Sequence, residues 1–295
     1  MNFQKIRAVL GNYFFIMPAF LLFFTFSLYP FIQVFHLSAT SWDGISRSYP
    51  YVGLDNFKDL LTDNKVFWQS MLNALYITGM ALTAQNLLAL LLAFLCDRDI
   101  KGGNIYRVIF YLPPVLSGIV VGLIWNWIYD GNYGLLNHFL GFIGLGNLSR
   151  AWLSDAKTAL IAVAIIHMWK GFGWGFVILL AGLQSIPRDL YEAARVDGAN
   201  TWTVFKCITV PLMIPVFILV SILTILGTMQ IFDIIIATTG GGPGYHTEVP
   251  ITRIVAMMIG SSKFGYACAM GVMFGLILLV VSMIQIRASK MMRQV

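Results

Sequence analysis

The sequence EAARVDGA, residues 192–199, is a polar stretch that lies between two long apolar segments, 158–183 and 211–237. It mixes charged residues with small ones and contains a glycine near its end. A chain that has few polar residues elsewhere has little reason to keep such a stretch unless another molecule binds to it. We therefore interpret 192–199 as a docking surface, and the remaining sequence indicates what docks there.

The composition excludes an ordinary soluble domain. The chain has 295 residues, of which 58% are hydrophobic and 11% are charged, and its mean hydropathy is +0.78. Soluble domains have about 25% charged residues, and a membrane-spanning helix needs about 20 mainly apolar residues. Six segments meet this length: 13–36, 71–95, 106–129, 158–183, 211–237 and 266–287. The sequence therefore predicts an all-α, polytopic membrane protein with six transmembrane helices in a single domain, 1–295.

The distribution of charge predicts the orientation of these spans. With the N-terminus in the cytoplasm, the inside segments contain 11 of the 19 Lys and Arg residues and five acidic residues, a net charge of +6. The outside segments contain seven basic and seven acidic residues. Because Lys and Arg accumulate on the cytoplasmic side of membrane proteins, we expect both termini in the cytoplasm. The basic balance thus reflects topology and does not indicate a nucleic-acid partner.

Neither the cysteines nor the N-terminus indicates a secreted protein. Cys96 and Cys207 fall near one side of the membrane and Cys268 near the other, so no disulfide framework is expected. The basic residues before the first apolar segment resemble the start of a signal peptide, but the segment is too long for the apolar region of such a peptide. We expect an uncleaved first span.

The second inside loop, 184–210, is long and has the pattern of two short helices. Pro187 suits a first helical turn, where its missing N–H costs nothing. Gly198 suits the left-handed position that ends a helix, and Asn200 suits the cap of a second helix that runs to about Ile208. The first helix is only about 15 Å long. Because so short a helix is marginal by itself, it needs a partner surface.

Two motifs resemble a known family. The docking stretch is similar to the EAA loop of the permease subunits of binding-protein-dependent ABC importers, and the matching residues are Glu192, Ala193, Ala194, Asp197, Gly198, Ala199, Phe205, Ile208 and Pro211. The stretch 232–247, with Phe-Asp and then TGGGPG, resembles the end of the fifth span in the carbohydrate branch of these permeases. The LPP at 112–114 and the WKG at 169–171 are also similar. The resemblance covers nearly the entire chain and implies a type I ABC importer permease fold.

The resemblance also implies an assembly. A second, homologous permease would complete a heterodimer in the plasma (inner) membrane of a bacterium or archaeon. Two ATPase subunits would lie on the cytoplasmic side, and an extracytoplasmic sugar-binding protein would deliver the carbohydrate. ATP and Mg²⁺ would bind to the ATPases, and this chain would bind no cofactor. It is expected to be a transport subunit and not an enzyme.

The docking stretch has the chemistry that such coupling requires. The expected ATPase-coupling residues are Glu192, Ala193, Ala194, Asp197 and Gly198. The two alanines permit close approach by another protein, the glutamate can pair with a partner cation, and the glycine permits a sharp turn. The chain has no G-x-x-x-x-G-K-[ST] phosphate loop, so ATP would be hydrolysed elsewhere. The alternative interpretation is an ordinary surface loop with a chance helix.

Polar residues within the spans are candidates for the substrate pathway, because such residues usually face a bundle interior or water. His167, Lys170 and Trp174 share one face of the fourth span. An aromatic ring beside hydrogen-bonding groups suits a sugar, and the resemblance implies substrate contact in this region. The alternatives are an interface aromatic for Trp174, a helix–helix hydrogen bond for His167, and a lysine that reaches a lipid headgroup.

The other candidates lie in the third and fifth spans. Thr228 and Gln230 fall where the resemblance places the cavity lining, and Asp233 needs a partner, for which Lys170 is available. Ser117 in the third span completes the set. The alternative role for all of them is packing between helices.

Two other classes of function compete with the importer. An ion-coupled secondary transporter would use His167, Lys170 and Asp233 as a proton relay, but it would not need a docking stretch for an ATPase. An intramembrane enzyme is disfavoured because no paired catalytic motif is present. The glycine-rich stretch at 240–244 follows a span and not a strand, so we interpret it as a turn and not a phosphate site. The sequence leaves open which sugar or polyol phosphate is carried, which permease is the partner, and which subunit makes most substrate contacts.

Overall fold

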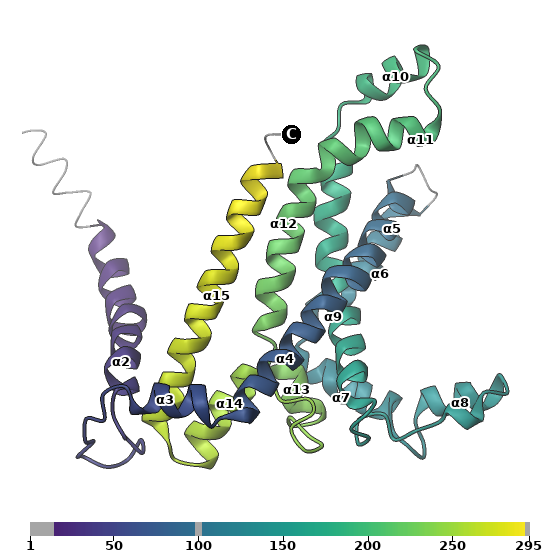
Figure 1. Ribbon diagram of the computed structural model, residues 1–295. Helices are drawn as coiled ribbons and strands as arrows, with labels where there is room; N and C mark the ends of the chain where they lie inside the picture. Colours follow the sequence, from purple (N-terminus) through teal and green to yellow (C-terminus); the bar gives the residue numbers. More distant parts are fainter. Residues whose placement is uncertain (1–14, 98–101, 293–295) are drawn as a thin grey trace, which may run out of the picture. The chain divides into compact units, whose positions relative to one another are not determined.

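The computed structural model describes residues 15–97 and 102–292, and these residues form helices and connecting loops (Figure 1). Five of the helices are long and apolar enough to cross a membrane, and a bent pair supplies a sixth span. This confirms the predicted all-α membrane fold. The terminal residues and the charged turn at 98–101, which carry part of the expected charge asymmetry, lie outside the described residues.

The chain packs in two compact units, where the sequence predicts one domain. The smaller unit combines Met1–Asn64 with Ile254–Leu276, and the larger combines Lys65–Arg253 with Ile277–Val295. In the smaller unit the first apolar helix covers Phe15–Ser38. This apolar helix includes η1 (Phe24–Leu28) and α2 (Tyr29–Ser38). The other elements of the smaller unit are α3 (Asp55–Thr62), η5 (Ala256–Gly260) and the first part of α15 (Phe264–Met292).

The loop after the first span folds back on its own unit. The Asn56 side-chain amide donates to the carbonyls of Ser38 and Thr40, both at 2.8 Å. The Trp42 ring lies 5.5 Å from that of Phe264, and the Trp42 carbonyl accepts from the backbone N–H at the start of α15. The turn-rich, aromatic sequence of this loop predicts such a folded cap, and these contacts confirm that the loop is folded.

The larger unit is built around α9 (Ala159–Gln184), which packs most extensively against three other helices. These are α5 (Asn86–Cys96), α6 (Gly103–Val115) and α12 (Val210–Met229). The remaining elements are α4 (Lys65–Met80), η2 (Ala81–Gln85), α7 (Gly118–Ile128), α8 (Leu135–Phe142), η3 (Gly146–Leu148), α10 (Arg188–Val196), α11 (Thr201–Val204), η4 (Phe205–Thr209) and α13 (Asp233–Thr238), followed by α14 (Pro250–Val255) at the boundary between the units.

Small residues on α9 let its neighbours approach closely. A side chain at Gly173 would meet the carbonyl of Phe110 and the ring of Pro114 on α6. On other faces of α9, Gly175 lies against Ala89 of α5, and Gly182 lies against α12. The hydrophobic effect gives little driving force for the association of helices within lipid, so transmembrane helices associate largely through close packing at small residues.

The third span is bent where the sequence predicts one helix over 106–129. Helices α6 and α7 meet at an angle of 98°. Two prolines occupy the last turn of α6, and Leu116 and Ser117 then adopt extended backbone. The hydroxyl oxygen of Ser117 accepts from the N–H of Val120 at 3.3 Å and so caps α7. Proline cannot donate to the preceding turn, which favours a break here.

The fifth span begins earlier and ends earlier than expected. Residues Thr201–Met229 form one continuous helix, so the prediction that the short helix after Asn200 ends near Ile208 is wrong. A π-helical turn, η4, immediately precedes Pro211. Its wider hydrogen-bonding pattern accommodates a residue that has no N–H, so the proline does not stop the helix. The chain leaves the helix at Gln230 and re-enters one at α13.

The packing of α9 on α6 predicts a large effect for Gly173→Ala. The added methyl group would overlap the Phe110 carbonyl and the Pro114 ring, and overpacking of this kind costs about 1–3 kcal/mol. We expect a clear decrease in the thermal unfolding midpoint of the detergent-purified assembly. Gly79→Ala is the matched control, because nothing lies within 4 Å of that position. Equal midpoints for the two variants would contradict the close contact.

Candidate functional site

A cavity of about 550 Å³ opens between α9, α12, α13 and η2 in the larger unit. It brings together six of the seven residues that the sequence suggests for the substrate pathway, namely His167, Lys170, Trp174, Thr228, Gln230 and Asp233. The rest of its lining consists of Gln85, Gly171, Gly175, Ile178, Val220, Leu223, Thr224, Gly227, Ile231 and Ile234. The cavity therefore has polar groups set in a mostly apolar wall, which is the usual character of a small-molecule site.

A hydrogen bond between α9 and α12 fixes His167. Its Nε2 lies 3.2 Å from the hydroxyl oxygen of Thr228. The Thr228 hydroxyl itself donates to the Thr224 carbonyl at 2.7 Å, so its oxygen accepts and His167 must donate through Nε2. In the neutral ring, Nδ1 is then the acceptor. The alternative of a helix–helix hydrogen bond is therefore correct for His167, and the same residue also lines the cavity.

Lys170 and Asp233 line the same cavity but do not form the expected pair. Within the described chain, no ion pair between them lies within 4 Å. A carboxylate oxygen of Asp233 accepts from the N–H of Ile234 at 2.9 Å, and the carboxylate packs directly over Gly118 of α7. The break after Met229 places Asp233 in the first turn of α13. Its carboxylate therefore points toward Gly118 on α7 and not toward Lys170 on α9.

Trp174 presents an accessible ring, whereas Ser117 is used for a structural contact. The Trp174 side chain is 55% exposed, and its ring meets that of Tyr111 edge-on at 5.4 Å. Ser117 caps α7 and does not line the cavity. It is next to Gly118, however, and so lies close to the Asp233 carboxylate. The structure thus gives the packing role to Ser117 and leaves the Trp174 ring free on one face.

Gln85 is a site residue that the sequence interpretation missed. It ends the π-helical turn η2, is buried, and lines the cavity. Among the described residues, its amide oxygen has no hydrogen-bond partner. The amide packs against α9 at Gly171, where an added Cβ would lie 2.7 Å from that oxygen. A glutamine inside a span is itself a signal of a functional site, and this signal was available in the sequence.

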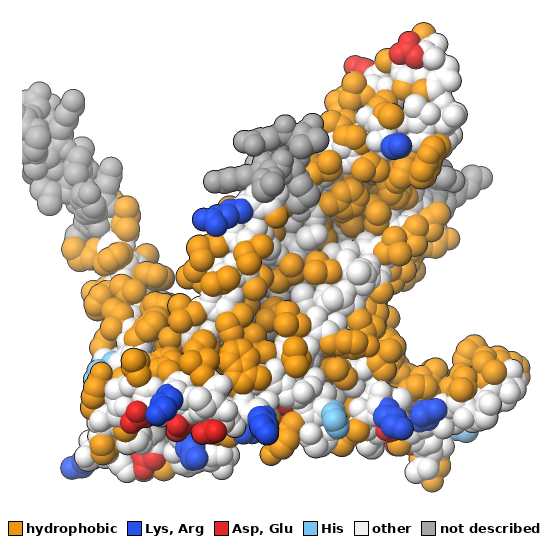
Figure 2. All heavy atoms as spheres, in the orientation of Figure 1, with side chains coloured by type: hydrophobic (Ala, Val, Ile, Leu, Met, Phe, Trp, Pro, Cys, Tyr) orange, Lys and Arg blue, Asp and Glu red, His pale blue; other side chains and the backbone are white. Residues whose placement is uncertain are grey.

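The docking stretch forms the helix and turn that the sequence predicts. Helix α10 follows Pro187 and has no buried residue. Gly198 has a φ of +76°, and Asn200 accepts from the N–H of Thr203 at 2.9 Å to cap the next helix. Glu192, Ala193, Asp197 and Gly198 are exposed, and Ala194 is half-buried. Figure 2 shows acidic side chains on the surface at this end of the larger unit.

The glycine-rich stretch is a folded turn at the other end of α9. Gly240, Gly241 and Gly244 have positive φ angles, and the Thr247 hydroxyl donates to the Gly242 carbonyl at 2.6 Å. The Glu248 carboxylate packs on Gly241, and burial raises the pKa of this carboxyl group. The interpretation as a turn is therefore correct. Among the described residues, no group of three or more His, Cys, Asp or Glu could hold a metal ion.

Comparison with known proteins decides the family. The family model described as "Binding-protein-dependent transport system inner membrane component" matches residues 85–294, which is more than half of the chain. The chain belongs to this family. It is therefore an inner-membrane permease component of a binding-protein-dependent ABC importer and not the ATPase of that system. The alternative of an ion-coupled secondary transporter is not supported.

Several relatives of the permease match along its length. The multiple sugar-binding transport system permease protein of Streptococcus mutans is 32% identical over 290 residues, which are 97% of this chain and 99% of the relative. The trehalose/maltose transport system permease protein of Thermococcus litoralis is 30% identical over 289 residues, covering 98% and 97%. A crystal structure of a bacterial ABC transporter that imports alginate has a chain with a TM-score of 0.84 at 23% identity, covering 97% of both chains. This last comparison shows the shared type I importer fold.

The hydrogen bonding around the cavity predicts opposite effects for two neighbouring amides of the permease. Gln85→Leu removes a buried oxygen that has no protein partner, so we expect an unchanged or higher unfolding midpoint for the purified assembly without substrate. Asn86→Leu removes the oxygen that accepts from Thr224 at 3.1 Å. The unpaired hydroxyl left behind costs about 1–3 kcal/mol, and the midpoint should decrease. A larger loss for Gln85→Leu than for Asn86→Leu would show that the Gln85 oxygen is paired.

Proposed function

We propose that the permease forms half of the translocation pathway of an ATP-driven sugar importer. The observation that carries this proposal is the cavity in which an accessible tryptophan ring and several polar side chains line one space between η2, α9, α12 and α13. An aromatic ring suits the apolar face of a pyranose, and amide and imidazole groups suit its hydroxyls. Relatives named for multiple sugars, for starch degradation products and for trehalose and maltose support a carbohydrate substrate.

Each lining group has a specific role in this proposal. The Trp174 ring stacks on the sugar, while Nδ1 of His167 accepts from a hydroxyl because Nε2 is already bonded to Thr228. The buried amide oxygen of Gln85, which has no hydrogen-bond partner among the described residues, accepts a hydrogen bond from a second sugar hydroxyl. Gln230, Lys170 and Asp233 supply further polar contacts at the ends of the cavity. The apolar wall keeps water away from these bonds.

The assembly that we propose contains a second permease, two ATPases and an external binding protein. The second permease forms a heterodimer with this one and closes the cavity, and ATP and Mg²⁺ bind to the ATPases alone. The family description names a binding protein. A solved relative of the same fold is described in complex with a periplasmic protein that carries an alginate pentasaccharide. Both termini and the 184–210 loop lie in the cytoplasm in this arrangement, and the glycine-rich turn lies outside.

Helix α10 is the proposed contact with an ATPase. Glu192 pairs with a cation of the ATPase, and Ala193 and Ala194 let the two surfaces approach closely. The helix is exposed, so it depends on a partner surface for stability. The Tyr191 hydroxyl lies 3.2 Å from that of Thr209 and ties α10 to the start of the fifth span. A movement of α10 is thereby passed to the helix that lines the cavity.

The energy source tests this function against the ion-coupled alternative. Proteoliposomes that contain the complete assembly should accumulate the sugar presented by the binding protein when ATP is inside. An uncoupler that removes the proton gradient should leave this uptake unchanged, because no step of the proposal uses the gradient. Uptake that stops with the uncoupler while ATP is maintained would overturn the proposal.

Gly198 provides a test of the docking turn. Its φ of +76° is unfavourable for a β-branched residue, whereas asparagine adopts this region more readily than other non-glycine residues. We expect Gly198→Val to reduce ATP-driven uptake about tenfold or more and Gly198→Asn to retain a larger fraction, with both proteins inserted at normal abundance. Gly102→Val is the control, because Gly102 has a similar φ of +83° in another loop. Normal uptake by Gly198→Val would refute the proposed coupling role.

Trp174 provides a test of the sugar contact. Trp174→Ala removes the exposed ring from the cavity wall, and the loss of one stacking face should raise the sugar concentration needed for half-maximal uptake. Trp174→Phe keeps an aromatic face and should lie between the wild type and Trp174→Ala. The measurement is initial uptake by proteoliposomes, with basal ATP hydrolysis as the control for assembly. If uptake by Trp174→Ala equals that of the wild type, the ring does not contact the sugar.

A further inference from the structure

The segment between α7 and α9 has a composition that its position outside the spans does not explain. Residues 131–149, which we call the α8 arm, contain no Asp, Glu, Lys or Arg. Its large apolar side chains are exposed, with Tyr133 at 85%, Leu135 at 67% and Phe142 at 90%. Helix α8 has eight residues and is therefore about 12 Å long, which is too short to cross a membrane. An aqueous loop would not normally carry so many exposed apolar groups.

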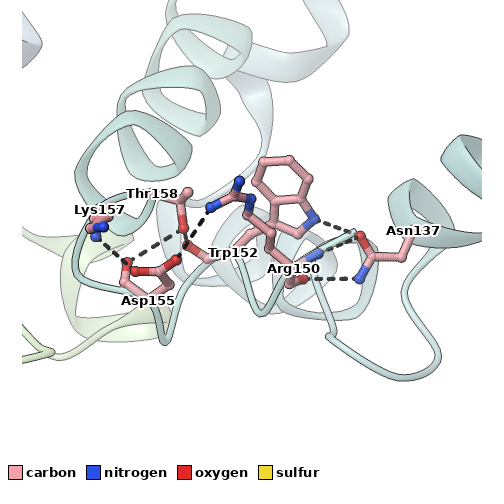
Figure 3. Close-up of polar contacts among 6 residues, drawn as sticks. All are labelled: Asn137, Arg150, Trp152, Asp155, Lys157 and Thr158. Carbon is pink, nitrogen blue, oxygen red and sulfur yellow. Dashed lines mark hydrogen bonds and ion pairs between the residues drawn. The ribbon is translucent and has the colours of Figure 1, made fainter. Parts of the chain in front are cut away.

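The side-chain amide of Asn137 in α8 is turned toward the base of the arm. The Asn137 side-chain amide donates to the Gly131 carbonyl at 3.0 Å. It also donates to the Arg150 carbonyl at 2.9 Å, and its oxygen accepts from Trp152 Nε1 at 2.8 Å (Figure 3). At the same base, Arg150 pairs with Asp155 at 3.9 Å. One residue thus anchors the helix to a charged loop. On the other faces of α8, the side chains of Leu135, Phe139 and Phe142 are exposed.

A groove follows the junction between α7 and α8. Its volume is about 590 Å³, and it is lined by Leu123, Ile124, Trp127, Ile128, Tyr133, Leu135 and His138. Trp127 at its edge is 82% exposed. Figure 2 shows hydrophobic side chains along the face of the arm that is turned toward the middle of the spans. The groove therefore continues the apolar surface of the third span onto the arm.

We propose that the α8 arm lies in the membrane interface and that an acyl chain of a phospholipid occupies the α7–α8 groove. Three observations favour lipid over a protein partner. The apolar surface is continuous from the exposed face of α7, the arm has no Asp, Glu, Lys or Arg to match to a partner, and the Asn137 side chain is already bonded to the base of the arm. Trp127 and Tyr133 have the chemistry of aromatic residues at the headgroup level, and a short apolar helix flat in the interface needs no spanning length.

The charged base of the arm fits the same placement. Asp130, Arg150, Asp155 and Lys157 flank the charge-free segment, so they lie at the level of the headgroups and water when the arm is in the interface. The leaflet is the one opposite α10, and the orientation in the proposed function makes it the outer leaflet. The arm then braces α7, which packs on α13 beside the cavity, against the bilayer.

Site-directed spin labelling of the complete assembly in lipid nanodiscs tests the placement. Cysteines are introduced singly at Phe139 and Phe142 in a background without native cysteines, and both positions are exposed, so labelling should not disturb the fold. We expect collisions with oxygen to exceed those with a water-soluble nickel complex by several-fold at these two positions. Labels at Asn132 and Lys157, near the base, should show the opposite preference.

Each other result overturns the proposal. Nickel accessibility at Phe142 equal to that at Asn132 would place the arm in water. Low accessibility to both reagents at Phe139 and Phe142 would place it against another protein. ATP-driven uptake is measured on the same labelled preparations, so that a failure of the proposed transport function is seen separately from a failure of the lipid contact.

Discussion

The hydrocarbon core of a bilayer contains no water, so every peptide group that leaves a helix there must find another partner. The two breaks in the spans of the permease meet this constraint in one region of the larger unit. The third span breaks at Leu116 and Ser117, and the fifth breaks at Gln230. The helices after these breaks, α7 and α13, pack on each other, with the Asp233 carboxylate over Gly118 and the Asn126 amide on the Ala237 carbonyl at 2.8 Å. At the breaks themselves the backbone groups bond locally, with the Val120 N–H on the Ser117 hydroxyl and the Ile231 N–H on the Thr228 carbonyl. The packing of α7 on α13 then places both breaks beside the cavity.

The cavity follows from close packing on one side and broken helices on the other. Small residues of α9 let α5, α6 and α12 pack closely against it. If the fifth span continued straight through Gln230, this packing would leave no space for a cavity. Because the helix ends at Met229 and α13 starts in a new direction, a space remains next to Lys170 and Trp174. Gln85 then reaches this space past Gly171. The same features that build the core therefore determine where polar side chains can face a substrate.

Hydrophobic length was sufficient to predict the number of spans, and spacing together with the family resemblance predicted six of the polar and aromatic side chains that line the cavity. His167, Lys170 and Trp174 follow from helical periodicity alone, and Gly198 and Asn200 follow from the backbone requirements of helix ends. The sequence could not show that Lys170 and Asp233 would fail to pair, because the position of the Asp233 carboxylate depends on the direction of α13 after the break. The 98° bend and the continuous helix through Pro211 depend on the backbone of neighbouring turns. Gln85 was missed because its contact with Gly171 depends on how two helices pack, although a glutamine in a span is visible in the sequence.

The continuous helix Thr201–Met229 links the two ends of the proposed mechanism. Its 29 residues span about 43 Å, from the cap at Asn200 to the cavity residues Thr224 and Thr228. The π-helical turn at Phe205–Thr209 keeps the helix continuous through Pro211, so a displacement of its first turns would tilt the whole helix. Thr228 holds His167, so a tilt of this helix would move a hydrogen bond that also orients a cavity group. In the proposed importer, one rigid element would therefore carry a displacement at the docking turn directly to the substrate contacts.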